Sequence, residues 1–293
     1  MNLFAQLLAN GLASGAAYVL LALGFAVIYN ATREFHIAHA GAFTAAGYAG
    51  HVAHERGLGL WGALVAAVAA AALYGAFVNG AVYAPLRRLG ASGLQMFVAS
   101  LGILTVFTAA VEIAFGPENL AWSGTARILA LGTTRVPFPF AVLAMITAAL
   151  VVVVHLVMNR TVRGFELRAV SSNLDLSQGT GIRVAAAFGF AYVLGSALVA
   201  PAAVIIGMDA GTNPYRGVGL ALVGIVATLM GGIGSYNGAV VTALAMALVE
   251  SLGLLAISSE WTRVLLYGLF IAVLMLRPHG LLGAAMRGKG GRA

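Results

Sequence analysis

The chain has 293 residues, of which 61% are hydrophobic and 9% are charged, with a mean hydropathy of +0.97 and a formal net charge of +7. A soluble domain normally has about a quarter of its residues charged, so this composition excludes a water-soluble globular protein and predicts that lipid surrounds most of the chain. The basic residues are scattered between apolar runs, which argues against nucleic-acid binding and favours the charge asymmetry of membrane proteins.

Apolar segments follow one another along the whole sequence, and each is long enough in its context to cross a hydrocarbon core of about 30 Å as a helix. None alternates in the way that a strand of a membrane β-barrel does. We therefore predict an all-α, polytopic helical membrane protein with about 8–10 transmembrane segments. The predicted segments are 6–30, 36–54, 59–82, 93–115, 137–158, 184–206, 218–232, 236–256 and 262–277. The chain, 1–293, is expected to form a single transmembrane domain.

Basic residues fall mainly on one side of this predicted topology. The first group, on odd-numbered loops and the tail, comprises Arg33, Arg87, Arg88, Arg160, Arg163, Arg168, Arg183, Arg277, Arg287, Lys289 and Arg292; the second comprises Arg56, Arg127, Arg135, Arg216 and Arg263. The positive-inside rule places the larger group in the cytoplasm, so we expect the N-terminus outside and the C-terminus inside. The first residues lack the basic start and cleavage pattern of a signal peptide and are predicted to lead into a retained helix.

Four histidines make the second predicted segment unusually polar. His36 and His39 lie three residues apart, as do His51 and His54. Each pair has a spacing that suits a metal, but the pairs are separated by roughly 22 Å along a continuous helix. No acidic or thiol ligand is nearby in the sequence, so we predict no metal and no cofactor in this chain, and favour histidines at the membrane interface or facing a pore.

Several polar residues lie in or near the predicted membrane segments. Glu112 and Glu250 are expected near the outer ends of their helices, where a carboxylate reaches water; proton coupling would instead favour a deep carboxylate. A second set carries groups that either bind a passing solute or join helices by hydrogen bonds. This set comprises Asn79, Ser100, Thr105 and Thr228.

One predicted cytoplasmic loop, at about 159–183, is longer and more polar than its neighbours. It is too long for a simple turn and too short for a catalytic domain. The helix-compatible "GFELRAV", followed by "NLDLSQ" and glycines, predicts a short helix on the membrane surface that contacts a soluble partner. The alternative is an ordinary basic loop that fixes the topology.

The sequence "GGIGSYNG" separates the seventh and eighth predicted segments. Its glycines, Gly231, Gly232, Gly234 and Gly238, allow a tight turn and close approach of two helices. A nucleotide-binding loop would need a Lys-Ser/Thr ending and a preceding soluble strand, so ATP is expected to bind to another chain. The sequence also lacks HExxH and GxSxG motifs, which argues against an intramembrane enzyme.

Five blocks, in order, resemble the permease subunits of branched-chain amino acid ABC importers and their urea- and amide-transporting relatives, over nearly the full length. They are "GFAVIYNATREFHIAHAGAFTAAGYAG", "LQMFVASLGILTVFTAAVEIAFGPE", "RAVSSNLDLSQGTGI", "LMGGIGSYNGAVVTALAMALVESL" and "LRPHGLLG". The resemblance implies a permease of the bacterial inner membrane that works by alternating access. It also implies as partners two ABC ATPases, a second permease that is either a related chain or an identical one, and an extracytoplasmic solute-binding protein.

The resemblance also implies roles for single residues. In the cytoplasmic motif, the residues expected to couple the chain to an ATPase are Glu166, Arg168, Ala169, Asp175, Gly181 and Ile182. The middle of this motif departs from the family pattern at Ser172, Asn173, Leu176 and Ser177, and Gly179 and Thr180 replace bulkier apolar residues. This departure predicts either a shorter or softer helix or an unusual ATPase partner. His39 matches the family's histidine, and the candidate translocation path is His39, Phe43, Tyr48, Ser100 and Thr228.

The solute stays open at this point between branched-chain amino acids, urea, amides and aromatic acids. The alternative function is an autonomous secondary transporter or channel. That class favours an internal repeat and charged or broken-helix sites near the middle of the membrane, and the sequence has no clear sign of either.

Overall fold

The computed structural model describes residues 3–123, 128–131, 134–277 and 280–282. Its helices in the first half are α1 (Leu3–Thr32), α2 (His39–Ala53), the π-helical η1 (His54–Leu58), α3 (Gly59–Phe77), the π-helical η2 (Val78–Tyr83), α4 (Ala84–Arg88) and α5 (Gly93–Phe115). In the second half they are α6 (Phe138–Arg160), α7 (Val162–Ser172), α8 (Leu174–Gly179), α9 (Val184–Leu198), α10 (Ala200–Ala210), α11 (Arg216–Gly231), α12 (Tyr236–Gly253) and α13 (Ser259–Leu276).

Six helical runs among the described residues are long and apolar enough to cross a membrane, and α11 is a shorter apolar helix. The six runs are Leu3–Thr32, His39–Arg88, Gly93–Phe115, Phe138–Arg160, Val184–Ala210 and Tyr236–Gly253. The predicted all-α, multi-pass membrane protein is thereby confirmed. The second run turns back on itself, since α2 packs against α3. Gly57 and Gly59, with positive φ angles of 81° and 64°, make the turn between them.

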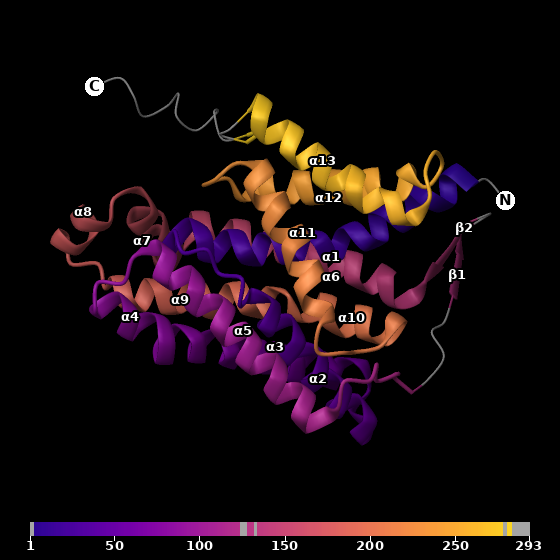
Figure 1. Cartoon of the computed structure of the whole chain (residues 1–293), viewed down its shortest axis with the longest axis horizontal. Coiled ribbons are helices and arrows are strands. Elements are labelled where there is room, and N and C mark those ends of the chain that lie inside the picture. The colour runs from indigo at the N-terminus through magenta and orange to yellow at the C-terminus, as the bar shows by residue number, and fades with distance from the viewer. Residues whose placement is uncertain (1–2, 124–127, 132–133, 278–279, 283–293) are drawn as a thin grey trace.

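Helix α1 is the centre of the bundle and contacts α12, α11, α9 and α6 (Figure 1). Apolar residues lie on all sides of this helix, as expected for a helix surrounded by other helices. Gly11 and Gly15 bring it close to α12: a Cβ on Gly11 would lie 3.0 Å from Ser251 Cβ, and one on Gly15 would lie 2.8 Å from Leu244 Cδ1. The GxxxG spacing therefore serves helix packing here.

The elongated bundle has two ends (Figure 1). The hairpin end holds the start of α1 and a short antiparallel ribbon of β1 (Ile128–Leu131) and β2 (Thr134–Pro137). Gln6 ties the two together, since its Nε2 donates to Arg135 O at 2.8 Å. The α7 end holds α4, α7, α8 and the turn between α11 and α12. The ribbon was not predicted; all of its residues except the last, Pro137, lie between the predicted segments 93–115 and 137–158.

The predicted segment 184–206 is divided in the structure. Helix α9 ends at Leu198 and α10 starts at Ala200, with Pro201 in its first turn, where the missing N–H of proline costs least. Helix α10 then runs to Ala210, beyond the predicted end, and stops at Gly211, which has a φ of 80°. Together α9 and α10 form one apolar run, so the interruption at Val199 does not divide the membrane crossing.

Candidate functional site

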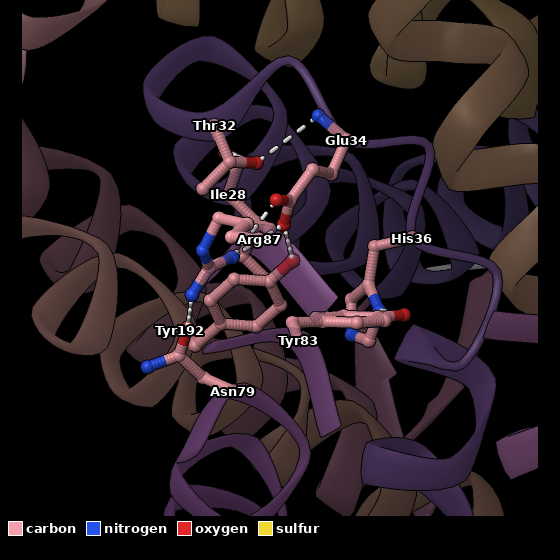
Figure 2. A network of polar contacts seen from close by, with 8 residues as sticks. All are labelled: Ile28, Thr32, Glu34, His36, Asn79, Tyr83, Arg87 and Tyr192. Atoms are coloured by element: carbon pink, nitrogen blue, oxygen red, sulfur yellow. Dashed lines mark hydrogen bonds and ion pairs between the residues drawn. The ribbon is translucent and has the colours of Figure 1, made fainter. Parts of the chain in front are cut away.

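A polar network lies where the loop after α1 meets η2, α4 and α9 (Figure 2). Nη1 of Arg87 donates to both carboxylate oxygens of Glu34, at 2.8 and 2.9 Å, and Nη2 donates to Asn79 Oδ1 at 2.5 Å. The hydroxyl of Tyr192 donates to Glu34 Oε2 at 2.5 Å. Asn79, which the sequence left open as a solute contact, is thus engaged in this network.

A buried histidine pair adjoins the network. His36 and His39 are both fully buried, and their ring centroids are 5.9 Å apart. His36 Nδ1 lies 2.9 Å from the hydroxyl of Tyr83, while its ring also contacts Tyr192 at 5.1 Å between centroids. Figure 2 shows Tyr83 beside His36, so the network continues from the charged groups to buried aromatic side chains.

The second histidine pair lies elsewhere, at the hairpin end. His51 and His54 pack against Trp122, with ring centroids at 5.5 and 5.3 Å. His54 Nε2 is 2.9 Å from Ser123 O. Within the described ranges, no group of three or more His, Cys, Asp or Glu side chains is placed to hold a metal ion.

The candidate path residues do not form one cluster. His39, Phe43 and Tyr48 share the buried α2 helix, and Tyr48 packs on Phe115 with ring centroids 4.6 Å apart. Ser100 lies next to its start, since Ser100 Oγ accepts a hydrogen bond from the Ala38 N–H at 2.8 Å. Thr228 instead joins α11 to α1 by donating to Ala22 O at 2.9 Å. The hydroxyls of Ser100 and Thr228 both hold neighbouring segments of the bundle together.

The long polar loop forms two short helices. Thr161 Oγ1 accepts a hydrogen bond from the Gly164 N–H at 3.1 Å and caps α7, and Asn173 Oδ1 accepts one from the Leu176 N–H at 2.9 Å and caps α8. Asn173 itself is extended, with φ −153° and ψ 110°, so the helix breaks there. Gly164 allows α7 to touch α6, because a Cβ at this position would overlap the carbonyl oxygen of Val157.

The residues expected to act in coupling take different positions on these helices. Glu166 pairs with Arg163 at 2.9 Å on the exposed side of α7. Arg168 turns back toward the bundle and donates to Met158 O and to Asn159 Oδ1. The remaining members shape the backbone: Ala169 O accepts the Asn173 N–H, Asp175 lies in the first turn of α8, Gly181 has a φ of 83°, and the Ile182 N–H donates to Ser177 O.

The glycine turn is packed from two sides at the α7 end. A Cβ on Gly238 would overlap the carbonyl oxygen of Gly231, so these two positions require the close approach of α11 and α12. Gly232 and Gly234 take φ angles of 102° and 93°. The segment after α13 docks on the same turn, since the Leu281 N–H donates to Met230 O at 2.7 Å. The two C-terminal sequence blocks therefore lie in contact.

A cavity of about 910 Å³ lies beside this turn and α7. Arg33 and Arg168 line it together with Asn30 and Tyr236, and Arg33 Nη2 donates to Ser171 O at 3.3 Å. Arg33 has a φ of 59°, a left-handed conformation that is uncommon for a residue with a side chain. The end of α1, α7 and the glycine turn thus form one assembly.

Comparison with known proteins shows which family the chain resembles. Residues 7–274 match the family described as the permease component of branched-chain amino acid transport systems. The chain is 25% identical over 296 residues to the high-affinity branched-chain amino acid transport system permease protein BraD of Pseudomonas aeruginosa, with 96% of each chain covered. It is also 25% identical over 299 residues to the permease protein LivH of Escherichia coli K12, again with 96% of each chain covered.

A relative that matches over a shorter stretch is the probable branched-chain amino acid transport permease protein LivH of Methanocaldococcus jannaschii, which is 26% identical over 228 residues, or 71% of this chain and 72% of that protein. No solved structure is detectably similar to the chain. The match of the family over residues 7–274 places the chain, a multi-pass membrane protein, in the branched-chain amino acid permease family.

Proposed function

We propose that this chain is the membrane-spanning subunit of an ATP-binding-cassette importer of the bacterial inner membrane. It moves a branched-chain amino acid, or a related small polar solute, by alternating access. Two ATPase subunits bind and hydrolyse the ATP, a second permease completes the pathway, and a solute-binding protein delivers the solute. The family membership and the similarity to the transport permeases BraD and LivH support this proposal.

The observation that carries the coupling part is the position of α7 and α8 outside the bundle. Their inner side is held by Leu167 and Val170, which are buried. Their outer side exposes large apolar side chains: Phe165 is 60% exposed and Leu176 is 66% exposed. Exposed apolar groups at the polar end of a membrane protein are a contact surface for a soluble partner, and this surface is where the ATPase docks.

The attachment of α7 transmits movement of the ATPase to the bundle. Arg168 bonds α7 to the end of α6, and Gly164 holds the same two helices in contact. Arg33, the residue that follows α1, donates a hydrogen bond to Ser171 O near the end of α7. Because α1 is the central helix, displacement of α7 acts directly on the core of the bundle. The α7 end is then cytoplasmic and the hairpin end faces outward, in agreement with the basic residues of the loops.

The translocation path in this proposal follows α2. His39, Phe43 and Tyr48 lie on this helix, and Ser100 fixes its start. The network of Glu34, Arg87 and Tyr192 closes the α7 end of the same region (Figure 2). Its opening and closing accompany the alternation between outward and inward access.

The test uses the importer complex purified from its native host and reconstituted in liposomes. Phe165→Asp and Leu176→Asp place a charge on the exposed face of α7 and α8. Leu89→Asp is the matched control, since Leu89 is 83% exposed at the same end but outside these helices. We expect the first two variants to lose the ATPases on purification and to lose ATP-driven uptake, while Leu89→Asp retains both. Uptake by Phe165→Asp and Leu176→Asp at the wild-type rate would refute the coupling role.

A further inference from the structure

A second cavity, of about 450 Å³, lies at the hairpin end and is formed by α1, α10, α11, α12 and α13. We call it the hairpin-end cavity. Its volume lies within the range of small-molecule sites, about 300–1,000 Å³. Two opposite charges, Arg216 and Glu250, line it together with apolar side chains.

Arg216 is the first residue of α11. Its Nη2 donates to Ala210 O at 2.9 Å and to Asn119 Oδ1 at 3.3 Å. Its Nε is buried and has no hydrogen-bond partner among the described residues. No carboxylate in the described ranges forms an ion pair with it, so its positive charge is held by neutral groups and remains available to an anion.

Glu250 lies near the end of α12. The hydroxyl of Tyr18 donates to Glu250 Oε2 at 2.7 Å. Within the described part of the chain no cation pairs with this carboxylate. An ionisable group close to a membrane segment without a counter-charge is a candidate for solute binding.

The two charges line one cavity from neighbouring helices. Helices α11 and α12 meet at Gly231 and Gly238, and Arg216 and Glu250 lie toward the other ends of these two helices. A single small molecule in a cavity of about 450 Å³ reaches both groups.

Apolar side chains complete the cavity. Val223, Met246 and Leu266 are buried and line it from α11, α12 and α13. Ile206 and Leu220 line it as well. They provide a water-poor surface for an aliphatic group beside the two charges.

We infer that the hairpin-end cavity binds the zwitterionic form of an aliphatic α-amino acid, with Arg216 at the carboxylate, Glu250 at the ammonium group and the side chain against Val223, Met246 and Leu266. This inference rests on the proposed function and narrows its solute. The cavity contains none of the α2 residues of the proposed translocation path, so it is a solute site separate from that path. Urea has no charge for either group and no aliphatic part for the apolar wall. The cavity at the α7 end is lined by Arg33 and Arg168 without a carboxylate, so it lacks a partner for an ammonium group.

The test is calorimetric titration of the membrane complex, with its ATPases and without the solute-binding protein, in lipid nanodiscs. The ligands are leucine, 4-methylpentanoate (leucine without the ammonium group), 3-methylbutylamine (leucine without the carboxylate) and urea. The unmodified complex is expected to bind leucine at least about 10-fold more tightly than either singly charged analogue, and not to bind urea. Equal affinity for all four ligands would overturn the inference without any variant.

Two variants assign the residues. Glu250→Gln should weaken the binding of leucine at least about 10-fold and leave the affinity for 4-methylpentanoate unchanged. Arg216→Gln should weaken the binding of leucine by a similar factor and leave the affinity for 3-methylbutylamine unchanged. Glu118→Gln and Arg135→Gln change exposed residues at the same end, outside the cavity, and should bind leucine like the unmodified complex. Loss of affinity for all ligands alike in the two cavity variants would point to a structural role and contradict the assignment.

The outcomes separate this inference from the proposed function. A complex that contains ATPases and imports leucine with ATP, but whose Glu250→Gln and Arg216→Gln forms bind leucine normally, refutes only the cavity assignment. A chain that recovers no ATPase and shows no ATP-driven uptake refutes the proposed function itself.

Discussion

Arg87 and Glu34 form a two-pronged ion pair between α4 and the loop after α1, with Nη1 of Arg87 at 2.8 and 2.9 Å from the carboxylate oxygens. The two side chains are 22% and 11% exposed, so water screens the pair only in part. The guanidinium group also lies 4.9 Å from the ring centre of Phe188. This pair joins segments 53 residues apart in the sequence.

Arg87→Met should lower the free energy of unfolding by about 1–3 kcal/mol, because it leaves the Glu34 carboxylate without its counter-charge. Arg88→Met is the control: Arg88 is exposed and forms no ion pair among the described residues. The measurement is the temperature at which the detergent-solubilised protein leaves the monodisperse peak in size-exclusion chromatography. An equal loss of stability in both variants would show that the ion pair of Arg87 with Glu34 does not stabilise the fold.

Tyr83→Phe should also destabilise the protein, by about 1–3 kcal/mol, because it removes the hydroxyl that bonds to the buried His36 ring. Tyr74→Phe is a matched change, since the Tyr74 hydroxyl is buried and has no hydrogen-bond partner among the described residues. Stability should be unchanged or higher in this variant, because the hydroxyl that is removed is buried without a hydrogen bond. The same chromatographic melting experiment compares them, and a larger loss for Tyr74→Phe would contradict the described network.

Gly238→Ala should lower stability by about 1–3 kcal/mol, because the new methyl group would overlap the carbonyl oxygen of Gly231 and push α11 from α12. Gly102→Ala in α5 is the control, since its Cβ would meet no described atom within 4 Å. Stability there should be unchanged or higher by up to about 1 kcal/mol. Thermal unfolding of both variants tests this packing. Equal stability of the two alanine variants would contradict the close contact of α11 with α12.

Gly164→Ala should reduce ATP-driven uptake without removing the protein from the membrane, because the methyl group would force α7 away from the carbonyl oxygen of Val157. Gly179→Ala in α8 adds the same methyl group where no described atom lies within 4 Å, and should transport normally. Uptake and ATP hydrolysis are measured on the same reconstituted samples. Normal uptake by Gly164→Ala would mean that contact between α6 and α7 is not needed for coupling.

The sequence predicted those helices best whose ends carry local signals. The predicted segment 93–115 coincides with α5, whose start is marked by the capping pair Ser92 and Gln95 and whose end is marked by Gly116. The predicted segment 137–158 agrees with α6, which begins after Pro137. The interruption between α9 and α10 was missed although Pro201 signals it, because a proline in a first helical turn leaves the apolar pattern unbroken.

The contacts of the site were much less accessible to prediction. Glu34, Arg87 and Tyr192 belong to three segments that are distant in the sequence, and no local pattern brings them together. The hairpin-end cavity poses the same difficulty, because Arg216 and Glu250 line one cavity only through the packing of α11 beside α12. The short ribbon of β1 and β2 was missed because its strands have four residues each, too few for a clear alternation.

The most direct test of the central claim is leucine uptake by liposomes that contain the complex purified through this chain, with its solute-binding protein added, in the presence and absence of ATP. We expect two ATPase subunits and a second permease to be recovered with the chain, and uptake to require ATP. Recovery of the chain alone, moving leucine in liposomes without ATP, would contradict the importer and support an autonomous transporter or channel.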